Sequence, residues 1–294
     1  EKVKQSKGEK IFSGVNACLL AVIALLTIYP LLYVLSASLS SSDAFLQGRV
    51  ILWPADFTWA AYAKVLGQQN IWIAYANTIY YTVLGTVVNM AFTIAGAYPL
   101  SKKYLPGGRT ISKLVVFTMW FNPGIIPFYM TLKGYGLLDT RTAIIVAFAI
   151  NTFNVILMRN FFQSVPDALE EAAAIDGAND MLILWKIMLP ISLPTLATLT
   201  LFYMVGHWNA YMNVIMYITD SKKYNMTAKL IQMINNTSES LLEGRTADDI
   251  TAQRITPEGI KATSIVMSTV PILIVYPFLQ KYFVNGVMVG SVKG

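Results

Sequence analysis

Long apolar runs alternate with short polar segments along this chain. The runs cover approximately residues 11–37, 71–100, 111–132, 140–160, 187–219 and 262–284. A helix needs about 20 apolar residues to cross the hydrocarbon core of a bilayer, and each run is about that long or longer. The pattern therefore predicts an all-α membrane protein with six transmembrane helices in a single domain of residues 1–294.

The first run has features of a cleavable signal peptide. It follows four lysines and ends near the small residues Ser36, Ala37 and Ser38. The apolar core of a signal peptide, however, spans only about 7–15 residues. Because this run is longer, we expect it to remain in the protein as the first span.

The orientation is predicted from Lys and Arg, which are enriched in cytoplasmic loops. When every loop is counted, the two sides hold nearly equal numbers of these residues. Long loops are weak topology signals. Once the long, mixed-charge loop at 220–261 is set aside, most Lys and Arg fall on the side of the N-terminus. We therefore expect both termini to be cytoplasmic.

The composition supports a membrane protein: 55% of the residues are apolar, 13% are charged and the mean hydropathy is +0.52, whereas soluble domains carry about 25% charged residues. The net charge of +6 comes from residues that flank apolar runs, which argues for membrane topology and against a nucleic-acid partner. The single cysteine, Cys18, is expected to be a small buried hydrophobe. No Cys and His cluster has the spacing of a metal site.

The segment 164–190 is small and acidic, and it lies between the fourth and fifth spans on the predicted cytoplasmic side. Ser164 and Pro166 suit a helix start, and the alanine-rich stretch that follows favours a helix. Gly177 suits its left-handed end, and a second helix is expected from about Asn179. Membrane-surface helices are usually basic, so this acidic pair of helices fits a protein-docking knob better than a lipid-facing one.

This segment, EEAAAIDGANDMLILWKIMLP at 170–190, resembles the EAA motif of permease subunits of bacterial ABC importers. The resemblance implies the type I ABC importer permease fold and a coupling helix that docks on an ATPase subunit. The residues that it assigns to docking are Glu170, Glu171, Ala172, Ala173, Asp176, Gly177, Ala178, Leu189 and Pro190.

Further stretches are similar to the carbohydrate branch of this family, related to the maltose permeases, and most of all to its subgroup for complex oligosaccharides such as uronate oligomers. They are GAYPLSKKYLPG at 96–107, GLLDT at 136–140 and YPFLQKYFVNGVMVGSVKG at 276–294. The resemblance implies that the tail 285–294 reaches the ATPase, whereas by itself it could be a frayed terminus. Its matching residues are Asn285, Gly286, Gly290, Lys293 and Gly294.

Motifs that the sequence lacks argue against several other classes of function. There is no G-x-x-x-x-G-K-[ST] phosphate loop, so ATP is expected to bind in a separate subunit. The spans lack the intramembrane acids that serve ion-coupled transport, and the lone His207 is expected to be a packing residue. This argues against the alternative of a secondary transporter; a channel is harder to exclude. No catalytic motif supports a membrane enzyme.

Aromatic and amide side chains within three of the spans are candidates for a sugar pathway. They are Trp120, Phe121, Asn122, Asn151, Asn154, Trp208, Asn209, Tyr211 and Asn213. Polar side chains in spans tend to face the bundle interior or a water-filled path. Asn can equally join helices, and Trp and Tyr favour the interfaces, so both interpretations stay open.

Taken together, the sequence predicts a permease subunit, not itself an enzyme, that imports a carbohydrate, such as a uronate or alginate oligomer, through the bacterial cytoplasmic membrane. Its expected partners are a second homologous permease, two ATPase subunits that bind Mg-ATP, and an extracytoplasmic solute-binding protein. The chain itself is expected to hold no metal or cofactor. A homodimer is not excluded by the sequence, although the resemblance favours a heterodimer.

Overall fold

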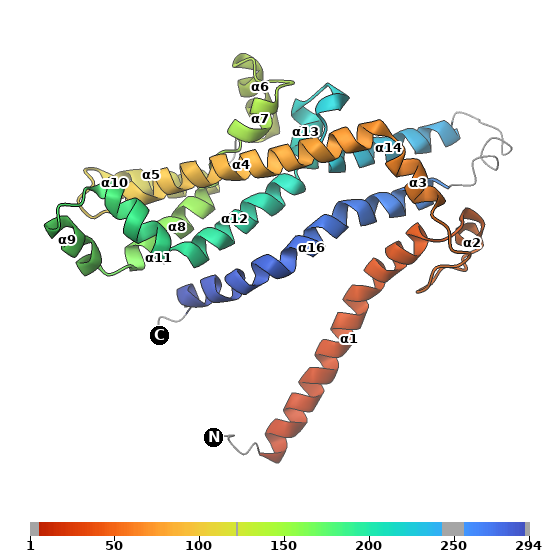
Figure 1. The fold of residues 1–294 in the computed structure, drawn as a ribbon, viewed down its shortest axis with the longest axis horizontal. Coiled ribbons are helices and arrows are strands. Elements are labelled where there is room, and N and C mark those ends of the chain that lie inside the picture. The colour runs from red at the N-terminus through yellow and green to blue at the C-terminus, as the bar shows by residue number, and fades with distance from the viewer. Residues whose placement is uncertain (1–5, 122, 243–255, 292–294) are drawn as a thin grey trace. The chain divides into compact units, whose positions relative to one another are not determined.

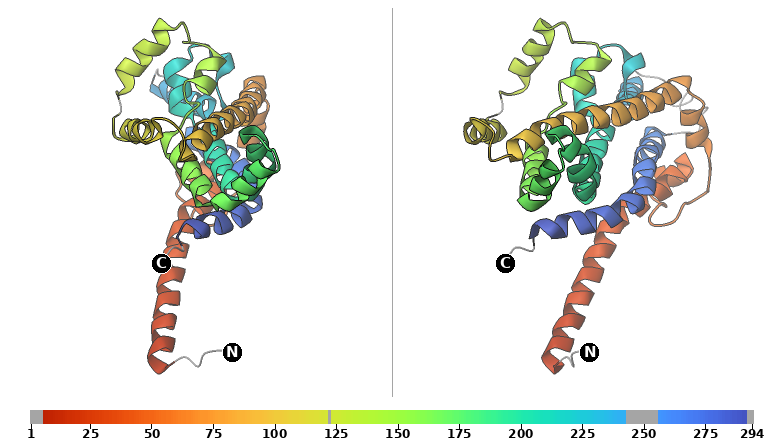
Figure 2. Two further views of the ribbon diagram at one scale, coloured as in Figure 1. Left: turned by 90° about the vertical axis from the view of Figure 1, so that its left-hand side faces the viewer. Right: turned by 60° about the vertical axis from the view of Figure 1, so that its left-hand side comes forward.

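The computed structural model describes residues 6–121, 123–242 and 256–291. Within these ranges the chain consists of helices and loops (Figure 1, with two further views in Figure 2), with one isolated antiparallel bridge between Ser40 and Phe57. Two compact units share the chain. One contains Glu1–Gln69 and Leu230–Val270, and the other contains Asn70–Lys229 and Pro271–Gly294.

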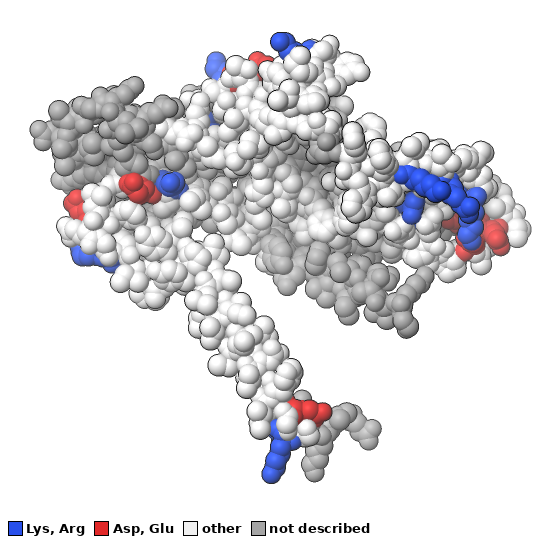
Figure 3. Space-filling model, turned by 180° about the vertical axis from the view of Figure 1, so that it is seen from behind, with Lys and Arg blue, Asp and Glu red and all other residues white. Residues whose placement is uncertain are grey.

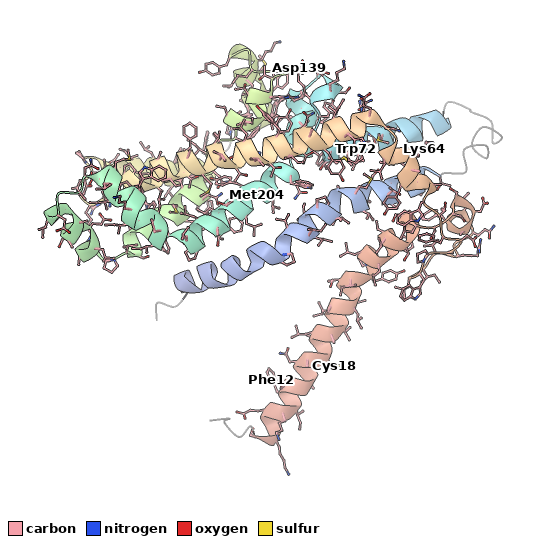
Figure 4. All side chains as sticks on the ribbon, in the orientation of Figure 1. Phe12, Cys18, Lys64, Trp72, Asp139 and Met204 are labelled. Atoms are coloured by element: carbon pink, nitrogen blue, oxygen red, sulfur yellow. The ribbon has the colours of Figure 1, made fainter. Side chains whose placement is uncertain are left out.

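The first unit contains α1 (Lys7–Ser38), which starts with a capping box between Ser6 and Glu9. The other helices that lie wholly or partly in it are α2 (Ser42–Leu46), α3 (Ala60–Leu66), α14 (Met226–Leu242) and α16 (Pro257–Ser291). Along α1 only the last turn is buried. Cys18 lies exposed on it (Figure 4), so the expectation of a buried cysteine is wrong for this chain by itself. An apolar, unburied helix of this length is suited to lipid or to another membrane subunit.

The second unit holds the remaining elements, which surround the two sites described below. They are α4 (Gln69–Ser101), α5 (Gly108–Trp120), α6 (Ile125–Gly134), α7 (Arg141–Val146), α8 (Thr152–Ser164), α9 (Asp167–Ile175), α10 (Asp180–Ile183), the π-helix η1 (Leu184–Met188), α11 (Leu189–Ile191), α12 (Leu193–Trp208), α13 (Tyr211–Tyr217) and the 3₁₀ helix η2 (Ser221–Lys223).

Three of the six predicted spans are broken. Three helices in the described residues are long and apolar enough to cross a membrane as single pieces: α1, α4 and the part Glu258–Val275 of α16. Two bent pairs could bring the number to five: α5 with α6, at 115°, and Asp180–Ile191 with Leu193–Trp208, at 82°. The predicted span 140–160 is divided between α7 and α8. Six spans therefore remain a prediction. The length of an apolar run does not show whether the helix within it is broken.

Two apolar clusters hold the second unit together. The first, here called the coupling-end core, joins α4, α8, α10, η1 and α12; its buried residues are Ala97, Tyr98, Val155, Met158, Phe162, Val165, Ile183, Leu184, Met188 and Leu199. The second joins α4, α6, α7 and α13; its buried residues are Tyr81, Leu132, Ile144, Ile145, Val214, Tyr217, Ile218 and Ala228. Between them α4 lies along α12, where the hydroxyls of Thr93 and Tyr203 are 2.7 Å apart.

Candidate coupling segment and transport cavity

The acidic segment between the fourth and fifth predicted spans folds as two short helices, as the sequence predicts. The first, α9, begins at Asp167 with Pro166 in the N-cap position and no side-chain cap. Ser164, which we expected to cap this helix, instead ends α8, and its hydroxyl donates to the carbonyl of Phe161 at 2.7 Å. The expected serine cap is therefore wrong, and the first turn of α9 carries the acidic residues Asp167 and Glu170 instead.

Gly177 ends α9 in the left-handed conformation, with φ at +84°. The N–H of Gly177 donates to the carbonyl of Ala174, and the N–H of Ala178 donates to the carbonyl of Ala173, both at 3.0 Å. These two hydrogen bonds are those of a Schellman motif, which satisfies the last carbonyls of a helix. Ala173 and Ala178 also pack against the coupling-end core, so the turn is fixed on both of its sides.

The second helix, α10, starts where the sequence predicts. The side chain of Asn179 caps it by accepting from the N–H of Leu182 at 2.8 Å. From α10 the backbone continues through η1 and α11 before α12 begins. The chain therefore passes from the exposed turn into α12 within a few turns.

Four side chains from the end of α4 and the loop after it fix the acidic segment. Lys102 forms an ion pair with Glu170, and Lys103 forms one with Asp167 at 2.6 Å. The hydroxyls of Tyr98 and Tyr104 contact the backbone carbonyl and the carboxylate of Asp180, at 3.1 and 3.0 Å.

These contacts give a structural role to the stretch GAYPLSKKY, which the sequence identified only by its resemblance to carbohydrate permeases. The hydrogen bond and charge of Lys103 also hold the pKa of the Asp167 carboxyl below its usual range, because they favour its ionised form.

The residues predicted to dock on an ATPase divide by exposure. Five are exposed: Glu171, Ala172, Asp176, Gly177 and Pro190. The other four are half-buried against the chain itself: Glu170, Ala173, Ala178 and Leu189. The structure adds Ile175, whose side chain is 87% exposed at the tip of α9. The sequence held a signal for it, since Ile175 is an apolar residue beside the turn of an otherwise small and acidic helix.

The predicted C-terminal contact residues fall at the end of α16. That helix runs to Ser291, so Asn285, Gly286 and Gly290 continue the helix and do not form a separate tail. Lys293 and Gly294 lie outside the described residues. The role of this segment at an ATPase stays a prediction.

An open cavity of about 1210 Å³ is lined by residues of α4–α8, α12 and α13. Four of the predicted pathway residues line it: Phe121, Asn151, Asn154 and Asn213. Trp120, Asn209 and Tyr211 are not among its described lining residues, Trp208 lines a different, apolar cavity of about 160 Å³, and Asn122 lies outside the described residues. The structure therefore brings together the amides from α8 and α13 but separates the two tryptophans from them.

The break between α7 and α8 forms one wall of this cavity, and Asn89 of α4 stabilises it. Its amide donates to the carbonyls of Phe148 and Ala149, at 2.8 and 3.0 Å. Carbonyls freed by a broken helix must find donors inside the protein, because lipid offers none. The Asn89 oxygen in turn accepts from His207 Nε2 at 2.7 Å. His207 is thus a buried packing residue, as expected, and Asn89 was missed although it is an amide within an apolar run.

The GLLDT stretch closes the other end of the second unit. Asp139 accepts from the N–H groups of Thr219 and Asp220, at 3.1 and 3.0 Å, and pairs with Lys223 at 3.1 Å (Figure 4). The hydrogen bond from Asp220 and the contact with Lys223 lower the pKa of the Asp139 carboxyl. Thr140 caps α7. The motif therefore joins the loop after α13 to the start of α7.

Comparison with known proteins places these features in a family. Residues 108–289 match the family described as "Binding-protein-dependent transport system inner membrane component". Protein LplC of Bacillus subtilis is 40% identical over 98% of this chain and 97% of its own length. The B. subtilis polygalacturonan/rhamnogalacturonan transport system permease protein YtcP is 40% identical over 94% and 96%.

A solved structure extends the likeness to the fold. A chain of a bacterial ABC transporter involved in the import of the acidic polysaccharide alginate is similar with a TM-score of 0.87 and 42% identity, over 95% of this chain and 99% of that one. The type I permease fold expected from the sequence is thereby confirmed.

Proposed function

The chain belongs to the family of inner membrane components of binding-protein-dependent transport systems and is a permease of a sugar-importing ABC transporter, and from that premise we propose that its cargo is an acidic oligosaccharide and that α9 couples its transport to ATP hydrolysis. Likeness to a chain of an ABC transporter over nearly the whole length argues against the channel and secondary-transporter alternatives.

The proposal of an acidic cargo starts from the relatives. The solved transporter is involved in the import of an acidic polysaccharide, alginate. YtcP is a permease protein of a polygalacturonan/rhamnogalacturonan transport system. The chain is similar to both at 40% identity or more over nearly its whole length. A shared chemical class of cargo is the simplest inference from likeness of this extent.

The cavity supports an oligomer as cargo. Its volume of about 1210 Å³ exceeds the usual size of small-ligand sites, which is about 300–1,000 Å³. Amides of Asn151 and Asn213 offer hydrogen bonds to sugar hydroxyls, and aromatic rings such as Phe121, Phe148 and Phe153 offer apolar faces. Such a mixture of apolar wall and few polar groups is typical of ligand sites.

No charged side chain is among the described residues that line the cavity. An acidic cargo would therefore meet only neutral donors from this chain, and burying a carboxylate without a counter-charge is costly. We expect the second permease subunit to supply the cations. This favours two different permease chains around the pathway over two copies of this one.

The observation that carries the proposed coupling is the coupling-end core. This cluster joins α4, α8 and α12, with Ala173 of α9 packed against it. The same three helices line the cavity, through Asn89 of α4, Phe153 of α8 and Tyr203 of α12. A displacement of α9 would thus move the walls of the cavity as a packed body, which is a rigid-body form of switching.

The remaining parts of the transporter follow from this arrangement. Of two ATPase subunits that bind Mg-ATP, one would dock at α9 of this chain, around Ile175, and the other at the second permease. A solute-binding protein would deliver the cargo from the opposite side. Both termini would lie in the cytoplasm, as the Lys and Arg distribution favours. The mixed-charge segment between α13 and α16, which the sequence predicts on the outer side, would face the binding protein.

Uptake by the reconstituted transporter tests the cargo. The complex is placed in proteoliposomes with ATP at the ATPase side and the binding protein at the other. Labelled galacturonate or alginate oligomers and a neutral oligosaccharide of equal length are compared. We expect ATP-dependent uptake of an acidic oligomer and little of the neutral one. Equal or greater uptake of the neutral sugar would refute an acidic cargo while leaving the coupling role of α9 intact.

A further inference from the structure

A third cavity, of about 590 Å³, lies beside the acidic segment, between the loop after α4, the first turns of α5 and the end of α8. Five basic residues line it: Lys102, Lys103, Arg109, Lys113 and Arg159. No Asp or Glu is among its described lining residues. Lys and Arg side chains gather at this end of the second unit on the face that Figure 3 shows. The proposed transport function does not use this cavity.

Two of the five cations are neutralised within the chain and three are not. Lys102 and Lys103 pair with Glu170 and Asp167 of α9. Arg109, Lys113 and Arg159 have no carboxylate within ion-pair distance among the described residues. The hydrogen bonds that the Arg159 guanidinium makes go to the amide oxygen of its neighbour Asn160, the closer at 2.9 Å. The cavity therefore carries an excess of positive charge that the described residues do not balance.

The position of these cations on α5 is unfavourable without an anion. Arg109 and Lys113 are four residues apart on one helix, where like charges repel each other. Arg109 also lies in the first turn, which holds no acidic residue and where the helix dipole disfavours a cation. An anion bound between Arg109, Lys113 and Arg159 would relieve both repulsions at once.

The residues around the cavity suit a lipid headgroup with its acyl chains better than a free ion. Leu105 and Val116 line it together with the basic residues. From there α5 presents Leu114 and Phe117, which are 61% and 60% exposed, and no residue of this helix is buried. A basic cavity that opens onto an apolar helix surface matches a phosphate headgroup joined to acyl chains, and basic pockets on the cytoplasmic side of membrane helices bind such headgroups.

We propose that the cavity formed by Arg109, Lys113 and Arg159 binds the phosphate group of an anionic phospholipid. Arg159 is half-buried and lines the cavity, and its guanidinium suits phosphate because its planar donors bind two oxygens together. Lys102 and Lys103 line this cavity and form ion pairs with α9. The bound lipid would therefore lie next to residues that hold the coupling segment.

Native mass spectrometry of the purified, delipidated transporter tests this site. Phosphatidylglycerol is titrated against phosphatidylcholine, and the copies bound by this subunit are counted. We expect preferential binding of phosphatidylglycerol, and a loss of affinity on the order of a hundredfold in the variant R109Q/K113Q/R159Q, since each cation near a membrane contributes roughly fivefold. Should the triple variant not assemble, Arg159→Gln alone is expected to weaken binding about fivefold.

A matched control removes the same number of charges elsewhere. Lys7, Lys10 and Lys186 are exposed basic residues on the predicted cytoplasmic side, and K7Q/K10Q/K186Q should retain phosphatidylglycerol. Equal loss in both variants, or equal binding of the two lipids, would overturn the site. Displacement of the lipid by inorganic phosphate would show a site for a free anion, and binding only after removal of the ATPase would show a protein-docking surface. Either result would contradict the lipid.

Discussion

Lys102, the first residue after α4, forms an ion pair with Glu170 of α9. Its ammonium also lies over the Tyr98 ring, 4.1 Å from the centroid. The side chains of Lys102 and Glu170 are only 7% and 25% exposed, so the pair is largely shielded from water. One pair thus ties a long membrane helix to the helix that we propose as the coupling element.

Removing the carboxylate should destabilise the transporter and weaken coupling together. Glu170→Gln removes the negative charge that balances the buried Lys102 ammonium, and losing a charged hydrogen-bond partner of a buried group costs about 1–3 kcal/mol. We expect a lower thermal unfolding temperature in detergent and less sugar transported per ATP hydrolysed.

The neighbouring ion pair is the matched control. The side chains of Lys103 and Asp167 are 85% and 66% exposed, and exposed pairs contribute little because water already solvates both charges. Asp167→Asn should therefore leave the unfolding temperature almost unchanged. If the two variants behave alike, the buried pair does not have the role assigned to it.

Gly177→Asp should leave the chain in the membrane but uncouple ATP hydrolysis from transport. No atom lies within 4 Å of a Cβ at this position, so the side chain fits the isolated chain, and Asp tolerates a positive φ better than most residues. In the complex the new carboxylate would enter the proposed docking surface. Gly177→Asn, of the same shape but neutral, should retain more coupling, and normal uptake by the Asp variant would refute the role of this turn.

Gly85→Ala should destabilise the protein because of its contact with His207. A Cβ at Gly85 would lie 2.5 Å from Cε1 of the buried His207 ring, and overpacking of this kind costs about 1–3 kcal/mol. Gly96→Ala is the control, since its Cβ would meet Val155 at an ordinary 3.7 Å. Adding His207→Ala should rescue Gly85→Ala in part, as measured by thermal unfolding. Absence of any rescue would argue against the steric origin.

Asn213 and Asn209 offer a matched pair for the cargo pathway. Asn213 lines the large cavity, whereas Asn209 is not among its described lining residues. Loss of one sugar hydrogen bond should lower uptake by Asn213→Ala about two- to tenfold, with ATP hydrolysis and expression retained. Uptake by Asn209→Ala should be close to that of the unchanged protein. A larger effect at Asn209 would place the pathway elsewhere.

Local signals allowed much of the structure to be predicted. Apolar runs located the membrane segments. Gly177 marked the end of α9 and Asn179 the start of α10, because capping is a property of neighbouring residues. The breaks within the predicted spans 140–160 and 187–219 were not foreseen. The break after α7 depends on Asn89, 59 and 60 residues away from the carbonyls it satisfies, and no local pattern reports such a partner.

The candidate sites were predictable to a similar extent. The acidic segment was located from its composition and its motif, yet its inward-facing half, with Glu170 and Ala173, could be separated from its outward-facing half only by seeing the packing. The cavity amides on α8 and α13 were identified by residue type. Trp120 and Trp208 were included for the same reason, and the helix geometry places them outside the cavity.

Recovery of an ATPase subunit with the tagged chain from detergent-solubilised membranes tests the central claim most directly. Glu171 is exposed on α9 beside Ile175, and Glu171→Lys reverses its charge at the proposed docking surface. The account predicts that the ATPase and a second permease accompany the unchanged chain, and that Glu171→Lys lowers recovery of the ATPase about tenfold or more. The same reversal at the exposed Glu258, at the start of α16, should have no effect. Undiminished recovery with Glu171→Lys, or a chain that transports sugar with no ATPase bound, would contradict the account.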